Sequence, residues 1–384
     1  MIQRDAKAEL TQLAKEFKAV AVVGPRQSGK TTLVRAVFND KPYLSLENPD
    51  TRAFAVQDPR GFLAQFPDGA ILDEAQRAPD LFSYLQQVLD ESPVRGRFIL
   101  TGSNNFLLQT SISQSLAGRI AYLNLLPFTL NELPTSAITE LHALIYKGFY
   151  PPLYDDGPNP ERWFANYLRT YVERDVRQIK NITDLASFER FVRLCAGRVG
   201  QLVNMNALAM DTGVDSKTIA SWLGVLESSF IIFLLRPHHR NFNKRLVKMP
   251  KLYFYDTGLA CALLGIGEAA NLALHPYRGA LFENLVVADL LKWRSHHGQP
   301  SGLYFWRNNS GNEVDLLLEI NGRLLPIEIK SGMTVRPEFF KGLQYWEKLS
   351  GEPGGAIIYG GDMPQQRSNG VRVLPWRDMH DVFS

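Results

Sequence analysis

The sequence predicts an α/β protein in which a parallel sheet is followed by a helical region and then by a second, mixed α/β domain. Through the first 155 residues, short apolar runs alternate with helix-like segments, as in a parallel sheet with crossover helices. Apolar residues then recur at three- and four-residue spacing, which indicates helices, and an Asn-Gly hairpin marks the last third. We expect four units, at residues 1–155, 156–200, 201–275 and 276–384.

The composition is that of a globular protein with a slightly basic charge balance. Of its 384 residues, 45% are hydrophobic and 21% charged, and the net charge of +3 permits a nucleic-acid partner without requiring one. Its two cysteines provide neither a disulfide framework nor a cysteine-based zinc site. The N-terminus shows no signal-peptide pattern, and the apolar run FIIFLL is too short to span a membrane. We therefore expect a cytoplasmic protein with no membrane partner.

The first strand leads into a phosphate-binding loop. The stretch GPRQSGKT matches the pattern G-x-x-x-x-G-K-[ST], with an apolar strand before it at 19–23 and a helix after it at 31–38. Backbone N–H groups of such a loop and the start of its helix attract phosphate oxygens. Lys30 would reach the β- and γ-phosphates, and the Thr31 hydroxyl would bind Mg²⁺. The expected contacts to ATP and its Mg²⁺ come from Gly24, Pro25, Arg26, Gln27, Ser28, Gly29, Lys30, Thr31 and Thr32.

A second apolar strand, at residues 70–72, ends in two carboxylates. Asp73 lies at its mouth and is expected to share the Mg²⁺ with Thr31, and Glu74 would polarise the water that attacks the γ-phosphate. An acidic helix cap would explain one carboxylate beside an apolar strand but not two. The sequence therefore predicts an ATPase site, in which the catalytic groups are Lys30 and Glu74.

Three further strands complete a five-stranded parallel sheet, at residues 43–47, in RFILTGSNN and at 120–126. An intervening strand between the phosphate loop and Asp73 is typical of ATPases rather than kinases. Thr101, Ser103 or Asn104 would sense the γ-phosphate or position water. Arg119 is a candidate arginine finger or sensor, from the same subunit or a neighbour, and a surface arginine at a helix–strand junction is the alternative.

The middle of the chain changes character after the Pro- and Gly-rich stretch GFYPPLYDDGPNPERW. Two amphipathic segments are predicted to form a helical linker that packs on the ATPase unit. Next, a short helix, a turn through Gly213 and a helix capped by Ser216 resemble a helix-turn-helix, and two apolar strands would form the wing of a winged helix.

A basic loop at residues 236–251 separates those two strands. It contains no acidic residue, and its cations are Arg236, Arg240, Lys244, Arg245, Lys248 and Lys251. Such a loop suits the tracking of a nucleic-acid backbone. A solvated loop, a loop docked on an acidic part of its own chain and a winged helix that binds a protein partner are the alternatives. The adjacent pairs His238–His239 and His296–His297 lack metal-site spacing and are expected at the surface.

The last third has the order helix, three strands, helix, strand, which resembles the core of restriction-endonuclease-like folds. Its centre is GNEVDLLLEINGRLLPIEIKSG, a hairpin with a two-residue turn at Asn321-Gly322. That turn sets Ile320 against Arg323, so that Asp315 faces Glu328 and Glu313 faces Lys330. The apolar residues expected on the buried face are Val314, Leu316, Leu318, Ile320, Leu325, Ile327 and Ile329.

The polar face of this hairpin is a candidate metal site. Opposed carboxylates repel, with Cβ atoms about 4.5–5.5 Å apart, and a bridging Mg²⁺ reverses the sign of that interaction. Asp315 and Glu328 would bind the metal, Glu283 from the preceding helix would add a third carboxylate, and Lys330 would orient or deprotonate water. The alternative is simple solvation, with Glu313 and Lys330 as an ordinary cross-strand ion pair.

Together these motifs resemble a family of bacterial and archaeal ATP-binding proteins. Its members join an AAA-type ATPase domain to a C-terminal domain of unknown function related to restriction-endonuclease-like folds. The resemblance spans nearly the whole chain through GPRQSGKTTL, ILDEAQ, LTGSN, LAGRI, YFYDTGL, the FEN of residues 282–284, EVDLLLE and PIEIKSG. It implies ATP binding with hydrolysis, and no settled biological role.

The expected function is a Mg²⁺-dependent ATPase whose C-terminal domain binds and cuts nucleic acid, with Asp315, Glu328 and Lys330 as its catalytic groups. ATP would move the winged helix and the C-terminal domain relative to the ATPase core. The competing hypothesis is an ATP-driven switch that binds a protein partner through the winged helix, with inert hairpin carboxylates.

Overall fold

The computed structural model describes residues 2–103, 116–138, 140–155, 157–171, 176, 182, 184–238 and 247–384. Its N-terminal unit holds the predicted parallel sheet, with the strand order β2-β3-β4-β1-β5. All its pairings are parallel, which confirms the predicted five-stranded parallel sheet. The strands are β1 (Ala19–Val23), β2 (Tyr43–Ser45), β3 (Ala70–Asp73), β4 (Phe98–Gly102) and β5 (Ile120–Asn124).

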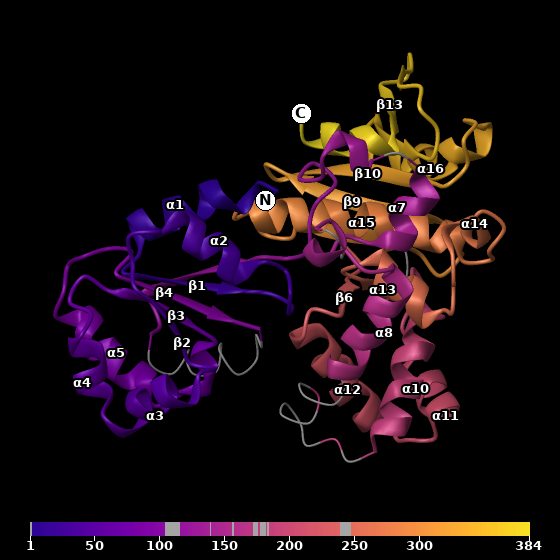
Figure 1. Ribbon diagram of the computed structural model, residues 1–384. Coiled ribbons are helices and arrows are strands. Elements are labelled where there is room, and N and C mark those ends of the chain that lie inside the picture. Colours follow the sequence, from indigo (N-terminus) through magenta and orange to yellow (C-terminus); the bar gives the residue numbers. More distant parts are fainter. Residues whose placement is uncertain are drawn as a thin grey trace.

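Helices cover both faces of this sheet, which is why its inner strand β1 is apolar throughout (Figure 1). On β1, Val20 and Val22 pack with α1 (Ala6–Glu16) and α2 (Lys30–Val37). Ala19, Ala21 and Val23 point to the opposite face. That face is covered by α3 (Pro49–Gln57), α4 (Pro59–Ala64) and α5 (Leu81–Asp90).

The middle of the chain is mainly helical and ends in a short antiparallel pair of strands. The helices are α7 (Leu141–Lys147), α8 (Pro160–Thr170), α10 (Leu185–Ala196), α11 (Met205–Thr212), α12 (Ser216–Ser228), α13 (Thr257–Leu263) and α14 (Ala269–Leu272). The strands are β6 (Ile232–Leu235) and β7 (Lys251–Phe254). The predicted cap of α12 is wrong by one residue: Asp215 Oδ1 accepts from the N–H groups of Lys217 and Thr218 at 2.8 and 2.9 Å, and Ser216 is the first helical residue.

The C-terminal unit is a mixed six-stranded sheet with the order β12-β13-β11-β10-β9-β8. Its elements are α15 (Arg278–His296), β8 (Leu303–Arg307), β9 (Glu313–Ile320), β10 (Arg323–Lys330), α16 (Lys341–Ser350), β11 (Gly355–Tyr359), β12 (Gln365–Gln366) and β13 (Val371–Pro375). Short 3₁₀ helices occupy Ala75–Arg77, Thr135–Ala137, Pro151–Leu153, Pro337–Phe340 and Trp376–Phe383. The predicted order of helix, three strands, helix and strand is present, and β12 and β13 extend it.

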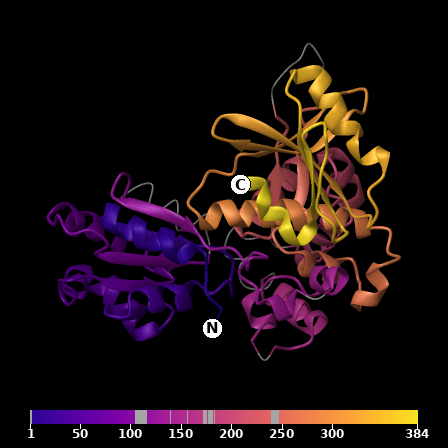
Figure 2. The same ribbon diagram turned by 90° about the horizontal axis from the view of Figure 1, so that it is seen from above.

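Helix α15 is the central element of the molecule. It packs against one face of the C-terminal sheet, and one continuous hydrophobic core joins it to the helical middle. One end of α15 packs against α1 of the N-terminal unit, and Figure 2 shows α15 from above at the junction with that unit. Helix α16 packs on the opposite face of the C-terminal sheet. In the described part of the chain, no helix has both the length and the apolar character needed to cross a membrane.

Candidate functional site

The phosphate loop joins β1 to α2 in a backbone that two glycines make possible. A Cβ at Gly24 would lie 2.1 Å from the Leu125 carbonyl oxygen, and Gly29 has a φ of 90°. Gln27 also adopts a positive φ, of 60°. Lys30 is buried at the start of α2, and its Nζ donates to the carbonyl oxygens of Gly24 and Pro25 at 3.0 and 2.7 Å. The loop therefore folds around the ammonium group that the sequence predicts as the phosphate ligand.

Asp73 stands beside this loop, at the end of β3, and accepts three hydroxyl hydrogen bonds. Thr31 Oγ1 lies 3.1 Å from Asp73 Oδ1, Tyr43 donates to Oδ2 at 2.7 Å, and Thr101 donates to Oδ1. Burial, together with the hydrogen bond to Asp73, raises the pKa of Tyr43 to about 12, so its hydroxyl stays protonated as a donor. A hydroxyl and a carboxylate at this separation are hard oxygen donors of the kind that Mg²⁺ takes, and they fit that ion.

Glu74 follows Asp73 in the left-handed region, with φ 53° and ψ 44°. This is a strained conformation for a residue other than glycine, and such strain gathers at functional sites. Ser103 Oγ donates to Glu74 Oε2 at 3.0 Å, and Gln76 donates to the same oxygen. The structure thus gathers the carboxylates of Asp73 and Glu74 with the hydroxyls of Thr101 and Ser103 at one edge of the sheet. Asn104, the third predicted polar residue here, lies outside the described residues.

Arg119 does not reach this site within its own subunit. It precedes β5, and its carbonyl accepts from the N–H of Ala19, so it lies at the edge of the sheet where strands begin rather than where they end. Its guanidinium makes two hydrogen bonds to Asp90, at 2.6 and 2.8 Å. The prediction of a sensor in the same subunit is therefore wrong, because the length of β1 separates Arg119 from the phosphate loop. Its role toward a neighbouring subunit stays a prediction.

A cavity of 330 Å³ opens beside the phosphate loop, on the side of Gly29 and Thr32. It is lined by three segments: the N-terminal residues, the first turns of α2, and parts of the chain after β5. The lining residues are Ile2, Gln3, Arg4, Lys7, Gly29, Thr32, Leu33, Ala36, Val37, Phe128, Pro151 and Asp155. None of them beyond the loop and helix was predicted from the sequence, since the other two segments are distant from the loop in the chain and carry no motif.

Arg4 links this cavity to the phosphate loop and to the chain after β5. Its guanidinium donates to the carbonyl oxygens of Ser28 and Leu126, each at 2.6 Å, and to Glu132 Oε1 at 3.0 Å. The guanidinium carbon also lies 4.8 Å from the centre of the Phe128 ring. One buried side chain therefore holds three separate segments around the cavity.

Helix α15 holds the same stretch of chain from the other side. Leu126 N–H donates to His296 Nε2 at 3.1 Å, Leu130 N–H donates to Asp289 Oδ1 at 2.9 Å, and Lys292 Nζ donates to the Phe128 carbonyl at 2.6 Å. His296 is fully buried, so the prediction of a surface histidine is wrong: its position was decided by packing against the ATPase unit rather than by spacing. Burial alone would raise the pKa of Glu132, but His296 and Arg4 outweigh it and lower that pKa to about 2.

The second predicted site assembles where β9 and β10 meet. The register from the Asn-Gly turn is confirmed over five pairs, from Arg323 with Ile320 to Ile327 with Leu316. Beyond it, Lys330 Nζ lies 2.7 Å from Asp315 Oδ2 and 2.5 Å from Glu328 Oε2, and the N–H of Ile329 donates to Asp315 at 2.9 Å. The structure therefore brings together the three residues that the hairpin geometry selected.

A bulge in β9 changes which side chains face the core. Its pairing with β8 passes from Tyr304–Leu317 to Trp306–Val314, which leaves one extra residue on β9 next to Asp315. Leu316 and Leu318 face α15, whereas Val314 and Leu317 pack with Trp346 of α16. The prediction that Val314 shares a face with Leu316 is therefore wrong, because strict alternation stops at the bulge.

Glu313 and Glu283 have other partners than the sequence suggested. Lys251 Nζ, from β7, lies 2.9 Å from Glu283 Oε1 and 2.5 Å from Glu313 Oε1. Glu313 also pairs with Arg307 at 3.1 Å, and Tyr253 donates at 2.5 Å to Glu283. The predicted pair of Glu313 with Lys330 is wrong, because beyond the bulge Glu313 pairs with Arg307 of β8.

These carboxylates, as folded, do not fit a divalent cation. Asp315 and Glu328 share Lys330, and Glu283 and Glu313 share Lys251, so an ammonium group stands where a metal would bind. Within the described ranges, no group of three or more His, Cys, Asp or Glu side chains is arranged to hold a metal ion.

Of the basic loop, the structure describes its two ends. Arg236 and Lys248 are exposed, and Lys251 is buried in the carboxylate cluster just described, so it is not part of a solvated basic surface. Arg240, Lys244 and Arg245 lie outside the described residues. The exposed residues in the middle of α12 are Lys217, Ala220 and Gly224. This face therefore has one charged side chain and is otherwise small.

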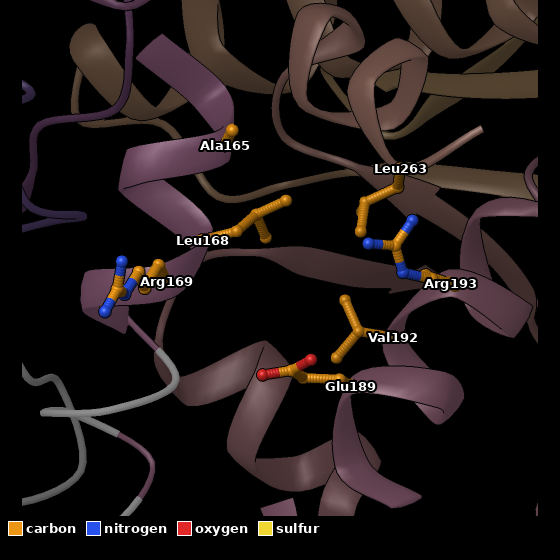
Figure 3. Close-up of a pocket in the computed structure, with 7 residues that line it drawn as sticks. All are labelled: Ala165, Leu168, Arg169, Glu189, Val192, Arg193 and Leu263. Atoms are coloured by element: carbon orange, nitrogen blue, oxygen red, sulfur yellow. The ribbon is translucent and has the colours of Figure 1, made fainter. Parts of the chain in front are cut away.

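A separate groove of 360 Å³ lies between α8, α10 and α13 (Figure 3). Leu168, Val192 and Leu263 form its apolar walls, and the guanidinium of Arg193 reaches into the same space. Arg169 and Glu189 add opposite charges at its rim, and none of these residues belongs to a predicted site.

The parallel sheet, the phosphate loop and the Asp73–Glu74 pair define an ATPase domain of the AAA class. Residues 16–134 match the family model of an AAA domain. Residues 138–270 match a domain of unknown function, DUF8612, and residues 278–379 match another, DUF4143.

Two mycobacterial proteins are similar to most of this chain. Uncharacterized proteins of Mycobacterium tuberculosis and Mycobacterium bovis are each 34% identical over 336 residues, which is 86% of this chain and 74% of theirs. The chain therefore belongs to the family of these mycobacterial proteins. An uncharacterized protein of Haemophilus influenzae is 24% identical over 209 residues, half of each chain (50%). Among solved structures, a Walker-type ATPase of Pyrococcus abyssi is similar with a TM-score of 0.47 and 15% identity, over 68% of this chain and 96% of that one.

Proposed function

We propose that the protein is a Mg²⁺-dependent ATPase that reports its nucleotide state to the C-terminal unit. The observation that carries this proposal is the meeting of Thr31 and Asp73, 3.1 Å apart, next to the buried Lys30. Lys30 exchanges its two loop carbonyls for the β- and γ-phosphate oxygens, and backbone N–H groups of the loop hold the remaining charge. Bound Mg²⁺ would neutralise charge between the phosphates, held by Thr31 and Asp73.

Glu74 is the group that acts on water in this proposal. Ser103 donates to one of its carboxylate oxygens, and the other would accept a proton from the attacking water. Tyr43 and Thr101 keep Asp73 oriented toward Thr31 through their hydrogen bonds. The cavity beside Gly29 takes the nucleoside, with the aromatic ring of Phe128 as one wall.

Two substitutions separate binding from turnover. Lys30→Ala is expected to abolish ATP binding, whereas Glu74→Gln is expected to keep binding and lower turnover by about 10²–10⁴-fold, the usual contribution of a general base. ATP affinity and phosphate release would be measured together, with the exposed Lys15→Ala and Glu91→Gln as matched controls. Turnover retained in Lys30→Ala would overturn the assignment of the nucleotide site.

A second function, nucleic-acid binding and cleavage by the C-terminal unit, is favoured by the cluster of Asp315, Glu328 and Lys330. Two carboxylates and a lysine around one point are the residue types that a metal-dependent nuclease carries, although in this structure the Lys330 ammonium occupies the place of the cation. The small, weakly charged solvent face of α12 argues against base reading by a winged helix, so contact with the backbone would fall to residues 236–248. The same α12 face supports the alternative in which the middle of the chain binds a protein partner.

A further inference from the structure

We propose that Lys251 is a built-in counter-ion that closes the carboxylate cluster of the C-terminal sheet to divalent cations. This inference rests on the proposed nuclease-like role of that cluster and concerns its regulation. Lys251 is carried by β7, in the middle of the chain, whereas the carboxylates are carried by α15, β9 and β10. Its ammonium group enters the cluster from a different part of the fold.

The burial and contacts of Lys251 show that its ammonium group pairs with the carboxylates of this cluster. The residue is 3% exposed, and its Nζ touches Glu283 at 2.9 Å and Glu313 at 2.5 Å. An uncompensated buried ammonium is costly, so a lysine is retained in such a place only with carboxylates around it. In return, Lys251 neutralises the two carboxylates that Lys330 does not reach.

The cluster also shows a polar atom that a cation would satisfy. Glu328 is 4% exposed, and its Oε1 has no hydrogen-bond partner in the part of the chain that the structure describes. Its other oxygen pairs with Lys330. A buried carboxylate oxygen without a donor is uncommon in proteins. That oxygen can therefore take a proton or a further cation, while Lys251 adds the repulsion that keeps a divalent cation out.

The position of Lys251 is fixed by its neighbours. Asn284, next to Glu283 on α15, accepts from the N–H of Phe254 at 2.7 Å and donates to its carbonyl at 2.9 Å. This pair of hydrogen bonds ties β7 to α15, so the ammonium group stays with the cluster as long as the middle of the chain stays docked. Undocking of β7 would remove this lysine and leave the four carboxylates with Lys330 and Arg307 as their remaining cations.

The experiment is a Mn²⁺ titration of the full chain, read by calorimetry and by thermal unfolding. Lys251→Met is expected to bind one additional Mn²⁺ per chain compared with the wild type, and Mn²⁺ is expected to raise its Tm more than that of the wild type. Adding Asp315→Asn to Lys251→Met should remove both effects.

Lys251→Arg, which keeps the charge, and Lys248→Met, which removes an exposed lysine of the same loop, should behave as the wild type. Lys251→Gln gives the same expected gain if the methionine variant fails to fold.

Two results would overturn the inference. One is a folded Lys251→Met or Lys251→Gln chain that binds no more Mn²⁺ than the wild type. The other is wild-type Mn²⁺ binding that Asp315→Asn abolishes, since the cluster would then be open with Lys251 in place. Cleavage of nucleic acid is measured separately. A gained Mn²⁺ site without cleavage supports the blocking role of Lys251 and contradicts the nuclease function. Cleavage by the wild type supports the nuclease function and contradicts the blocking role of Lys251.

Discussion

At the scale of single residues, Glu328 is the carboxyl group of the cluster that stays protonated near neutral pH. Burial, and then the charge of Asp315, raise the pKa of Glu328 to about 8. Burial would also raise the pKa of Asp315, but Lys330 and Lys251 outweigh it and hold that pKa below its usual range. The two facing carboxylates thus titrate apart, and near neutral pH one of them keeps its proton.

This difference predicts a pH dependence of stability. In the unfolded chain a glutamate releases its proton near pH 4.5, whereas folded Glu328 keeps it up to about pH 8. The folded state therefore binds more protons across that range, and this group's contribution to stability is complete below about pH 4.5 and lost as the pH rises through about 8. Glu328→Gln should flatten the fall in the free energy of unfolding between those values, as measured by urea unfolding at a series of pH values. The exposed Glu338→Gln is the control, and an unchanged slope in Glu328→Gln would contradict the assignment.

Which residues the sequence could predict depended on how local their partners are. Lys30, Thr31 and the Asp73–Glu74 pair follow from motifs, because a phosphate loop and a strand-end carboxylate occur in fixed local contexts. Tyr43, Arg4 and Lys251 could not be predicted, since each acts through a partner in a distant segment with no pattern of its own.

At the scale of elements, the hairpin of β9 and β10 shows what a turn can and cannot decide. A two-residue Asn-Gly turn fixes the register of the residues next to it, and that register was predictable. The bulge in β9 arises from its pairing with β8, which the turn does not influence, and it redirects Val314 and Glu313. The helix order was likewise predictable from apolar spacing, whereas the contact of α15 with the ATPase unit was not.

Arg4 allows a test of the contacts around the cavity beside the phosphate loop. Arg4→Met removes the buried cation that pairs with Glu132, and breaking such a pair costs about 3–5 kcal/mol of stability. It should also weaken ATP binding, because the Ser28 carbonyl and Phe128 lose their common support. Arg4→Lys keeps the charge but lacks the planar guanidinium group. Its stability and ATP affinity should therefore lie between those of the wild type and Arg4→Met. Urea unfolding and ATP titration check this, with the exposed Arg95→Met as control, and unaltered ATP affinity in a destabilised Arg4→Met would make Arg4 purely structural.

At the scale of the whole molecule, the net charge of +3 is too small to decide on a nucleic-acid partner, and the distribution of charge matters more. Lys251 and Lys330 pair with carboxylates inside the cluster, so neither is available to a phosphate backbone, and we predict that the other cations of the basic loop make that contact.

A combined Arg240→Ala, Lys244→Ala and Arg245→Ala variant should therefore bind DNA and RNA more weakly and lose affinity less steeply as salt rises. Each lost phosphate contact lowers the salt slope by about one. Fluorescence anisotropy over a range of salt concentrations measures both. Lys15→Ala is the control, and an absence of wild-type binding at low salt would leave the protein-partner hypothesis in its place.

The bonds from α15 to the chain after β5 also have a consequence for synthesis. The strands of the N-terminal sheet all emerge from the ribosome within the first third of the chain, and domains generally fold as they appear. Phe128 and Leu126, however, are held by Lys292 and His296, which are made much later. A nascent chain can thus build its parallel sheet early, but the cavity beside the phosphate loop acquires its final wall only once α15 exists. Full ATP affinity would then mark a chain whose synthesis has passed α15, and truncated products would be poor consumers of ATP.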